Sequence, residues 1–382
     1  MIQSIDLRNF KSIKSKHFPL RNLNILLGLN GQGKSSFIQS LLLLRQSADS
    51  LRKGQLLLNG NEFKIGSTKD ALYQYAKDPL SIGLQFNDTD PYLMEFEYQI
   101  ESDVFNQKSS LEVISNNYIA NNAGQPLLSS NFQYLNANRI EPKTIHSKSY
   151  TSVVSQSNIG SLGEYTVHFL ETRGSEDIKF ENCLHHKTKS SKNSFNEDIK
   201  DRRIINQVNL WLGEISPDIN VKTTSISSDY VKLEYEFEQP TYGKTMSFKP
   251  ENVGFGISYA LHVVTALLAS RPGELIIIEN PESHIHPRGQ AELGKLIALV
   301  AQNDIQVIIE THSDHILNGI RVAVKEAAID KNKVLAYYFT KVIMDTEQYS
   351  KILNIEIDKN GTLSDYPENL LDEWSNQLSK LI

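Results

Sequence analysis

The 382-residue chain contains one cysteine, Cys183, and only 12 prolines and 2 tryptophans. A single cysteine excludes an internal disulfide and any zinc site built from several thiolates. No apolar run approaches the roughly 20 residues that a membrane-spanning helix needs. Residues 1–18 carry charges where a signal peptide would have its apolar stretch. We therefore expect a cytoplasmic protein with no membrane partner.

The chain also has no large excess of charge of one sign. Its 39 Lys and Arg residues stand against 45 Asp and Glu residues, a formal net charge of −6. Such a protein is not a general cation that coats nucleic acid or anionic lipid, although a local basic patch stays open. Hydrophobic residues make up 40% of the chain, which is enough for a sizeable core and excludes global disorder.

Apolar runs and helical patterns alternate near both ends of the chain. Leu23–Leu27 predicts a strand that is followed by a glycine-rich loop and a long apolar helix. Leu275–Ile278 and Val307–Ile309 predict two more buried strands, separated by residues at helical spacing. Strands that alternate with helices predict an α/β fold with a largely parallel sheet.

The middle of the chain has a different pattern. Ser81–Ile100 and Val231–Phe237 alternate apolar and polar residues, as half-exposed antiparallel strands do. Glu181–Phe195 is polar, basic and rich in serine, which predicts an exposed or mobile loop.

Residues 28–35 read GLNGQGKS and match the phosphate-loop motif G-x-x-x-x-G-K-[ST]. Its glycines let backbone N–H groups surround a phosphate at the start of a helix, Lys34 reaches the β- and γ-phosphates, and Ser35 binds Mg²⁺. The alternative is a glycine-rich turn that carries the motif by chance, but the flanking strand and helix favour a nucleotide site. The predicted ATP ligands here are Gly28, Asn30, Gly31, Gly33, Lys34, Ser35 and Ser36.

A second group of polar residues follows the two buried strands of the C-terminal part. The first strand delivers Glu279 at its carboxyl end, where α/β sheets bind nucleotides, and the second runs into His312. A histidine at that place can contact a γ-phosphate or position the attacking water. Upstream, Asn252–Ser258 opens a helix with another glycine-rich N-terminus.

These pieces together resemble a known family. NFKS at residues 9–12, GLNGQGKSS, VGFGIS, IIIENPESHIHP and ETHSDHIL resemble the ABC-type ATPases of the SMC, Rad50 and RecF group. They look most like the prokaryotic, AAA-labelled branch that includes the overcoming-lysogenisation (OLD) ATPases and the ATPase subunits of anti-phage systems such as Septu.

The resemblance implies an α/β ABC-type ATPase head, with its P-loop sheet covered by helices, an antiparallel β-rich lobe and an inserted middle region. The implied segments are 1–135, with the P-loop and the β-rich lobe, 136–244 as the middle region, and 245–382, with the remaining motifs. It also implies a homodimer that sandwiches ATP and Mg²⁺, and a separate effector protein, a nuclease or toxin.

By the same resemblance, Gly254, Gly256 and Ser258 hold the place of the ABC signature, which completes the site of the opposing subunit. Glu279 is the Walker B acid and shares the metal with Ser35. His312 is the switch histidine. Lys11 and Ser12 match a segment that often lies near the nucleotide.

One position departs from the family pattern. Where most relatives have Asp-Glu-Pro, this chain has Glu279-Asn280-Pro281, so an amide replaces the usual catalytic glutamate. An amide cannot accept a proton from water. Two hypotheses follow: either Glu282 acts as the general base, or hydrolysis is slow and the protein works as an ATP-controlled clamp.

Other interpretations of these residues stay open. His284 and His286 could bind a metal with the nearby glutamates, and Cys183, His185 and His186 offer soft ligands, although an exposed loop is favoured. A loose basic stretch could contact nucleic acid or be a solvated face: Lys187, Lys189, Lys192, Lys200, Arg202 and Arg203. The alternative functions are a RecF-like ATPase that clamps DNA and a small-molecule kinase, which would need an arginine-rich lid that the chain lacks.

Overall fold

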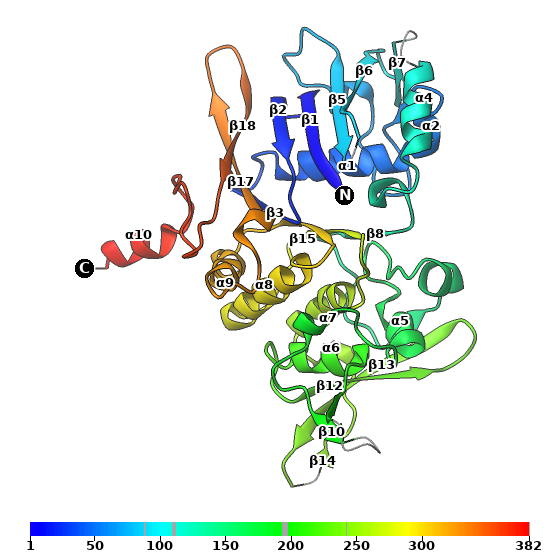
Figure 1. The fold of residues 1–382 in the computed structure, drawn as a ribbon, viewed down its shortest axis with the longest axis vertical. Coiled ribbons are helices and arrows are strands. Elements are labelled where there is room, and N and C mark those ends of the chain that lie inside the picture. Colours follow the sequence, from blue (N-terminus) through cyan, green and yellow to red (C-terminus); the bar gives the residue numbers. More distant parts are fainter. Residues whose placement is uncertain (88, 109–111, 193–197, 242, 382) are drawn as a thin grey trace. The chain divides into compact units, whose positions relative to one another are not determined.

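The structure is a computed structural model of the 382-residue chain, and it describes residues 1–87, 89–108, 112–192, 198–241 and 243–381. Contacts between residues divide the chain into two compact units. Unit 1 contains Met1–Phe132, Val334–Ile357 and Leu363–Ile382, and unit 2 contains Gln133–Lys333 and Asp358–Thr362 (Figure 1).

Unit 1 contains an antiparallel sheet with the strand order β2-β1-β5-β6-β7-β4. The strands are β1 (Ile2–Phe10), β2 (Ile13–Pro19), β4 (Gln55–Leu57), β5 (Leu80–Phe86), β6 (Tyr92–Glu97) and β7 (Val104–Gln107). Leu84 of β5 pairs with Tyr92 of β6, which confirms the antiparallel strands predicted within Ser81–Ile100.

The phosphate loop of unit 1 lies between β3 (Leu23–Leu27) and α1 (Lys34–Gln46). β3 pairs in parallel with β17 (Val334–Ile343), which forms a long antiparallel hairpin with β18 (Gln348–Ile355) (Figure 1). The buried ring of Phe18 contacts Phe37 of α1 and Tyr337 of β17, with centroids 4.6 and 5.4 Å away. These aromatic contacts fix the helix that follows the loop against the strands.

Shorter elements complete unit 1. They are α2 (Ala48–Leu51), α3 (Thr68–Ala71), α4 (Glu112–Asn121), a 3₁₀ turn at Pro126–Leu128 and α10 (Glu373–Ser379). Within the described residues of both units, no helix combines the length and apolarity that crossing a membrane requires.

Unit 2 carries the other predicted buried strands. β15 (Leu275–Glu279) and β16 (Gln306–Glu310) pair in parallel, and β8 (Phe132–Leu135) is the other neighbour of β15. The helices are α7 (Phe255–Leu268), α8 (Pro287–Ala301) and α9 (Asp314–Lys325). A Cβ at Gly319 would lie 2.1 Å from the Ala291 carbonyl oxygen, so α8 and α9 pack backbone to backbone.

The rest of unit 2 combines a second sheet with two helices. The sheet contains β9 (Ile145–Ser147), β12 (Ile219–Ser225), β13 (Tyr230–Gln239) and β14 (Gly243–Lys244), and β10 (Ser190–Lys192) pairs with β11 (Asp198–Lys200). The helices are α5 (Thr166–Arg173) and α6 (Ile204–Leu212), with a π turn at Thr151–Ser155 and 3₁₀ turns at Glu181–Cys183, Pro250–Asn252 and Lys331–Lys333. β12 and β13 pair in antiparallel register, which confirms the strand predicted at Val231–Phe237.

The predicted exposed loop at Glu181–Phe195 is partly correct, and residues 193–195 lie outside the described part of the chain. Most of its described residues are exposed, but two are buried. Cys183 and His185 are each only 2% exposed. The indole N–H of Trp211 donates to the Cys183 carbonyl oxygen at 3.0 Å, and Gln207 accepts from the His185 backbone N–H at 2.9 Å. Because polar side chains of α6 satisfy the backbone hydrogen bonds of Cys183 and His185, this segment can be buried.

Candidate functional site

The backbone of the phosphate loop needs glycine at three of its positions. Gly28, Gly31 and Gly33 have φ angles of 130°, 74° and 103°, in the region that side chains with a Cβ rarely adopt. A Cβ at Gly28 would also lie 2.3 Å from the Phe339 carbonyl oxygen. Gly33 is the N-cap of α1, so the positive end of the helix dipole faces the loop.

Lys34 lies inside this loop. Its side chain is almost fully buried, and its Nζ donates to the carbonyl oxygens of Gly28 and Leu29 at 2.8 and 2.9 Å. The ammonium group is therefore held by the loop itself, beside the N-terminus of α1. An anion that enters the loop meets both the lysine charge and the helix N-terminus.

Ser350 of β18 supports the phosphate loop from a distant part of the sequence. Its hydroxyl donates to the Gln32 carbonyl oxygen at 2.7 Å and lies 2.8 Å from the hydroxyl of Ser12. Nothing in the sequence near the motif marks Ser350, because the contact is made by a strand more than 300 residues away. The predicted neighbour Lys11 donates to Gln39 Oε1 at 2.7 Å, and burial lowers its pKa.

A cavity of about 210 Å³ lies beside the loop within unit 1. Lys11, Ser12 and Gly31 line one part of it, so the sequence-predicted residues are neighbours here. Tyrosines and polar residues of later segments line the rest: Tyr73, Gln74, Tyr75, Lys341, Gln348, Tyr349 and Ser350. Unit 1 thus places an aromatic and polar cavity next to its anion-binding loop.

Unit 2 holds the carboxylate of Glu279 at the end of β15. The Tyr134 hydroxyl donates to Glu279 Oε1 at 2.9 Å, and the Ala137 backbone N–H donates to Oε2 at 3.3 Å. Burial raises the pKa of Glu279, although both hydrogen bonds and the Arg139 charge act in the opposite direction. Sequence reasoning missed Tyr134, since a tyrosine in a buried strand has no motif.

Arg139 fastens the turn that follows Glu279. Its guanidinium donates to the carbonyl oxygens of Glu279 and Asn280 at 2.8 and 2.6 Å and lies 5.5 Å from the ring centre of Tyr259. The side chain is 3% exposed, and burial lowers its pKa to about 10. Arg139 therefore fixes the backbone of the turn at residues 279–286, which we call the acidic turn.

Asn280 adopts an unusual backbone conformation. Its φ angle is 44°, which asparagine tolerates better than most residues, and its backbone N–H donates to the Glu310 carbonyl oxygen at 2.8 Å. Its side-chain oxygen Oδ1 is buried and has no hydrogen-bond partner among the described residues. A buried acceptor of this kind suits a bound water, which would donate to it.

Both carboxylate oxygens of Glu282 accept hydrogen bonds from the segment that contains His312, the predicted switch histidine. Oε2 accepts from the Thr311 hydroxyl and Oε1 from the His312 backbone N–H, each at 2.8 Å. The structure therefore brings the Glu282 carboxylate into contact with the backbone of His312. The backbone of the His312 segment is positioned by the acidic turn.

The three residues predicted to form the signature have different surroundings at the start of α7. Gly254 is the exposed N-cap, and a Cβ there would meet nothing within 4 Å. Gly256 packs against the acidic turn, where a Cβ would lie 2.3 Å from the His284 carbonyl oxygen. Ser258 is 4% exposed, and its hydroxyl lies 3.4 Å from that of Tyr235.

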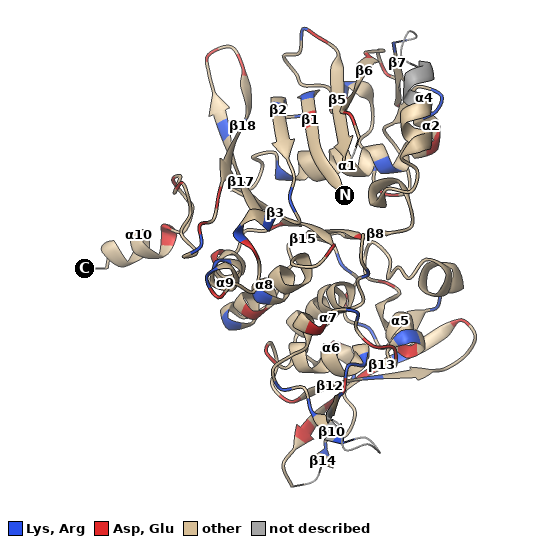
Figure 2. Ribbon diagram, viewed as in Figure 1, with Lys and Arg blue, Asp and Glu red and all other residues tan. Residues whose placement is uncertain are grey.

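Two of the open interpretations can be compared with the structure. The His286 side chain caps α8 by accepting the Arg288 backbone N–H at 3.3 Å, and the His284 ring lies 4.9 Å from that of Tyr259. Both histidines thus have structural contacts in the turn after Glu279. Figure 2 shows basic and acidic residues interspersed along unit 2. The predicted basic stretch is partly neutralised, through Lys187–Glu214, Lys200–Glu181 and Arg203–Asp201.

The raised pKa of Glu279 leads to a stability prediction. The pKa of Glu279 is higher in the folded state than in the unfolded chain. Between these two pKa values the folded state binds more protons, so its stability falls as the pH rises through that range. Glu279→Gln removes this titration. We expect the unfolding free energy of Glu279→Gln to increase relative to that of the wild type as the pH rises from acidic to neutral. Chemical denaturation of both proteins at matched pH values measures this difference. A constant difference across this range would contradict the prediction.

Comparison with protein families gives two matches. A family model described as an AAA ATPase domain matches residues 1–317, and a family of proteins of unknown function (DUF3696) matches residues 329–381. No curated protein matches the sequence. The first match contains all of the predicted motif residues, from Lys11 to His312.

Solved structures show where a similar fold occurs. An SMC head bound to the C-winged helix domain of ScpA aligns with a TM-score of 0.54 and 14% identity, over 94% of this chain and 99% of that chain. The SMC head domain from Thermotoga maritima aligns at 0.46 and 13%, over 93% and 99%. The Pyrococcus furiosus Smc head, solved with an extended coiled coil and the C-terminal domain of ScpA, aligns at 0.49 and 12%, over 100% and 99%. The first alignment confirms the predicted α/β head fold.

Proposed function

Because the chain belongs to the AAA ATPase domain family, we propose that it binds ATP with Mg²⁺, pairs with a second copy around the nucleotide and hydrolyses ATP slowly. The observation that carries the proposal is the loop at residues 28–35, with its three left-handed glycines and the Lys34 ammonium held inside it. An ATPase domain implies nucleotide binding, and this loop has the groups that bind the phosphates of a nucleotide.

The first step of the mechanism is phosphate binding in unit 1. An entering phosphate offers Lys34 Nζ a charged acceptor in place of the Gly28 and Leu29 carbonyl oxygens, and charge-assisted bonds are the stronger ones. The Ser35 hydroxyl would bind Mg²⁺, as in other phosphate loops. The neighbouring cavity, lined by Tyr73, Tyr75 and Tyr349, would hold the nucleoside.

The second step is activation of water by unit 2. In this proposal, Glu279 would help to hold the Mg²⁺ that accompanies ATP, while Asn280 would accept a hydrogen bond from the attacking water through its unpartnered Oδ1. An amide orients water but takes no proton, so general-base help worth about 10²–10⁴-fold is missing. Turnover is then on the low side of the usual range of roughly 1–10³ s⁻¹.

Glu282 acts through His312 in this mechanism. Both of its oxygens already accept hydrogen bonds from the Thr311–His312 segment, so we assign Glu282 as a positioning residue that fixes the backbone of the predicted switch histidine. For this reason we propose the slow clamp, rather than Glu282 as general base, from the two hypotheses that the sequence left open. A slow clamp keeps the ATP-bound state long enough to control another protein.

Dimerisation would use the exposed N-terminus of α7. Gly254 is exposed with open space around it, and the first N–H groups of a helix lack partners within the helix. This end can bind the γ-phosphate of a nucleotide held by a second copy. Ser258, being buried, would support the helix from inside rather than touch the phosphate.

We further propose a separate effector, a nuclease or toxin, as the protein controlled, in an anti-phage system. The support is the resemblance of the motifs to OLD-like and Septu-type ATPases. In the solved relative, an SMC head binds a domain of ScpA, so heads of this fold do bind other proteins. Pairing of basic residues with acids in unit 2 is the reason to rank this function above RecF-like DNA clamping.

Substitution of Gly254 tests the dimer. Gly254→Glu fits the backbone, whose φ is −55°, and a carboxylate suits a helix N-terminus, so the fold should be kept. The same charge repels a γ-phosphate. With a non-hydrolysable ATP analogue, we expect sedimentation to show dimers of the wild type and monomers of Gly254→Glu, with the analogue still bound by each monomer.

The matched control is Gly124→Glu, which adds the same charge at another exposed glycine with open space around it. This control should dimerise like the wild type. Equal dimerisation by Gly254→Glu would exclude α7 from the interface. A wild type that binds the analogue yet stays monomeric would contradict the proposed sandwich.

A further inference from the structure

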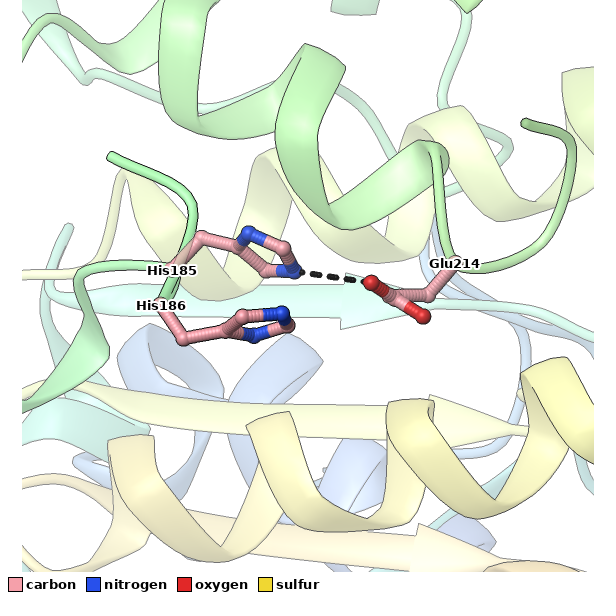
Figure 3. A group of neighbouring side chains, drawn as sticks. All are labelled: His185, His186 and Glu214. Atoms are coloured by element: carbon pink, nitrogen blue, oxygen red, sulfur yellow. Dashed lines mark ion pairs between the residues drawn. The ribbon is translucent and has the colours of Figure 1, made fainter. Parts of the chain in front are cut away.

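Three side chains with metal-binding groups meet in unit 2, apart from the residues assigned to ATP. They are His185 and His186, which follow the turn at Glu181–Cys183, and Glu214, which follows α6. One ligand atom from each lies within 4.8 Å of the other two. Figure 3 shows both imidazole rings extending from the loop toward the Glu214 carboxylate.

The imidazole of His185 lies beside both other members of this group. Its side chain is 1% exposed, and the buried Nε2 forms an ion-pair contact with Glu214 but no well-directed hydrogen bond among the described residues. Glu214 Oε1 lies only 3.2 Å away, and the Glu214 side chain is 6% exposed. The edge of the ring faces Trp211, with centroids 5.0 Å apart. A nitrogen and a carboxylate that are buried this close together usually share a hydrogen bond or a common ligand.

We propose that His185, His186 and Glu214 bind a divalent transition metal, with Zn²⁺ the preferred ion. Two imidazoles and one carboxylate form a known zinc-ligand set that leaves a coordination position for water. With metal–ligand bonds of about 2.0–2.1 Å, two ligands of a tetrahedral ion lie roughly 3.3 Å apart. The separation of 3.2 Å between His185 Nε2 and Glu214 Oε1 already fits.

The remaining ligand can close onto the ion. His186 is exposed, and its ring centre lies 4.2 Å from that of His185, so rotation of one surface side chain completes the set. The Lys187 backbone N–H lies 3.3 Å from His185 Nδ1, which places the proton of the neutral ring on Nε2. Metal binding moves this proton to Nδ1 and gives up that long contact.

Two basic side chains already contact Glu214, and they define the competition that a metal meets. Lys187 Nζ lies 3.1 Å from Oε1, and Arg288 lies 3.2 Å from Oε2. Their side chains are 59% and 71% exposed, so each can withdraw into solvent. Lys187 occupies the oxygen that faces His185, so a metal must displace its ammonium group. Arg288 can stay and orient the carboxylate from the other oxygen.

The test is titration of the full-length, metal-free protein with Zn²⁺ alone, followed by calorimetry, and with Co²⁺, followed by its visible absorption. We expect one site. His186→Ala, a change at the surface, should lower the affinity by at least about 10-fold. Lys187→Ala should raise the Zn²⁺ affinity several-fold, because the competing cation is lost. Lys189→Ala, the matched change at a neighbouring exposed lysine, should leave it unchanged.

Two results would overturn the proposal. One is the absence of saturable Zn²⁺ binding by the wild type. The other is binding that survives His186→Ala but is lost in the double variant His284→Ala/His286→Ala, which would place the ion beside the acidic turn. A structural role of the three residues alone predicts no gain of affinity in Lys187→Ala, so that variant separates a metal site from an ion-pair network.

Discussion

Replacing Lys34 with alanine is expected to reduce ATP affinity by roughly 100-fold or more while the fold is kept. The ammonium group offers two charge-assisted hydrogen bonds to phosphate oxygens, each worth about 1.5–3 kcal/mol. Their loss corresponds to about 10²–10⁴ in the dissociation constant. In the free protein, Lys34 Nζ donates to the Gly28 and Leu29 carbonyl oxygens, and water can replace these bonds. The free energy of unfolding should therefore change by about 1 kcal/mol or less.

The measurement is equilibrium binding of a fluorescent ATP analogue, with chemical denaturation of the same samples. Lys53→Ala is the matched control, because Lys53 is exposed and lies outside the loop. It should bind ATP like the wild type. Unchanged ATP affinity of a folded Lys34→Ala variant would remove the phosphate-loop assignment and, with it, the proposed function. Zn²⁺ binding by this variant should be unaffected, so failure of one proposal can be told from failure of the other.

The strands and the helix that carry the predicted nucleotide-binding residues could be predicted because their sequence signals are local. Leu23–Leu27 and Leu275–Ile278 are short runs of apolar residues, and the structure has strands at Leu23–Leu27 and Leu275–Glu279. The start of α1 at Lys34 follows from the motif, since glycines must precede the helix. Such features depend on a few consecutive residues, which a sequence displays directly.

The supporting residues could not be predicted, because their partners are distant in sequence. Tyr134 contacts Glu279 across 145 positions, and Ser350 contacts Gln32 across 318 positions. Neither tyrosine nor serine carries a marker of such a role. The burial of His185 was not predicted, for a related reason. Its polar neighbours in the sequence predict exposure, whereas hydrogen bonds with α6 satisfy the backbone inside the protein.

The roles of Asn280 and Glu282 lead to the second large effect, on the rate of hydrolysis. In Glu282→Gln, the amide can donate to the Thr311 hydroxyl and its oxygen can still accept the His312 N–H, so both contacts of the wild type are kept. As a positioning residue, Glu282 should tolerate this change with turnover near that of the wild type. Glu282→Ala removes both contacts and should slow turnover up to about 10²-fold through misplacement of His312.

The opposite expectation holds if Glu282 is the general base. Glu282→Gln would then lose about 10²–10⁴-fold in turnover, as much as Glu282→Ala, because neither side chain accepts a proton. Single-turnover hydrolysis with saturating ATP distinguishes the two roles, since it measures the chemical step without product release. Thr311→Val removes one of the two contacts. If Glu282 is a positioning residue, the single-turnover rate of Thr311→Val should lie between those of the wild type and Glu282→Ala; if Glu282 is the base, it should not.

Asn280→Asp completes this series by returning a carboxylate to the usual position of the base. Aspartate has the size of asparagine and also tolerates the φ angle of 44°, whereas glutamate in that region costs roughly 1–2 kcal/mol. If the amide is what limits hydrolysis, Asn280→Asp should accelerate the chemical step by part of the 10²–10⁴-fold that a base contributes. The gain should vanish in Asn280→Asp/Glu282→Ala, where His312 is no longer held. Fast wild-type turnover that Asn280→Asp does not raise would mean that another group takes the proton, and the slow clamp would then be wrong.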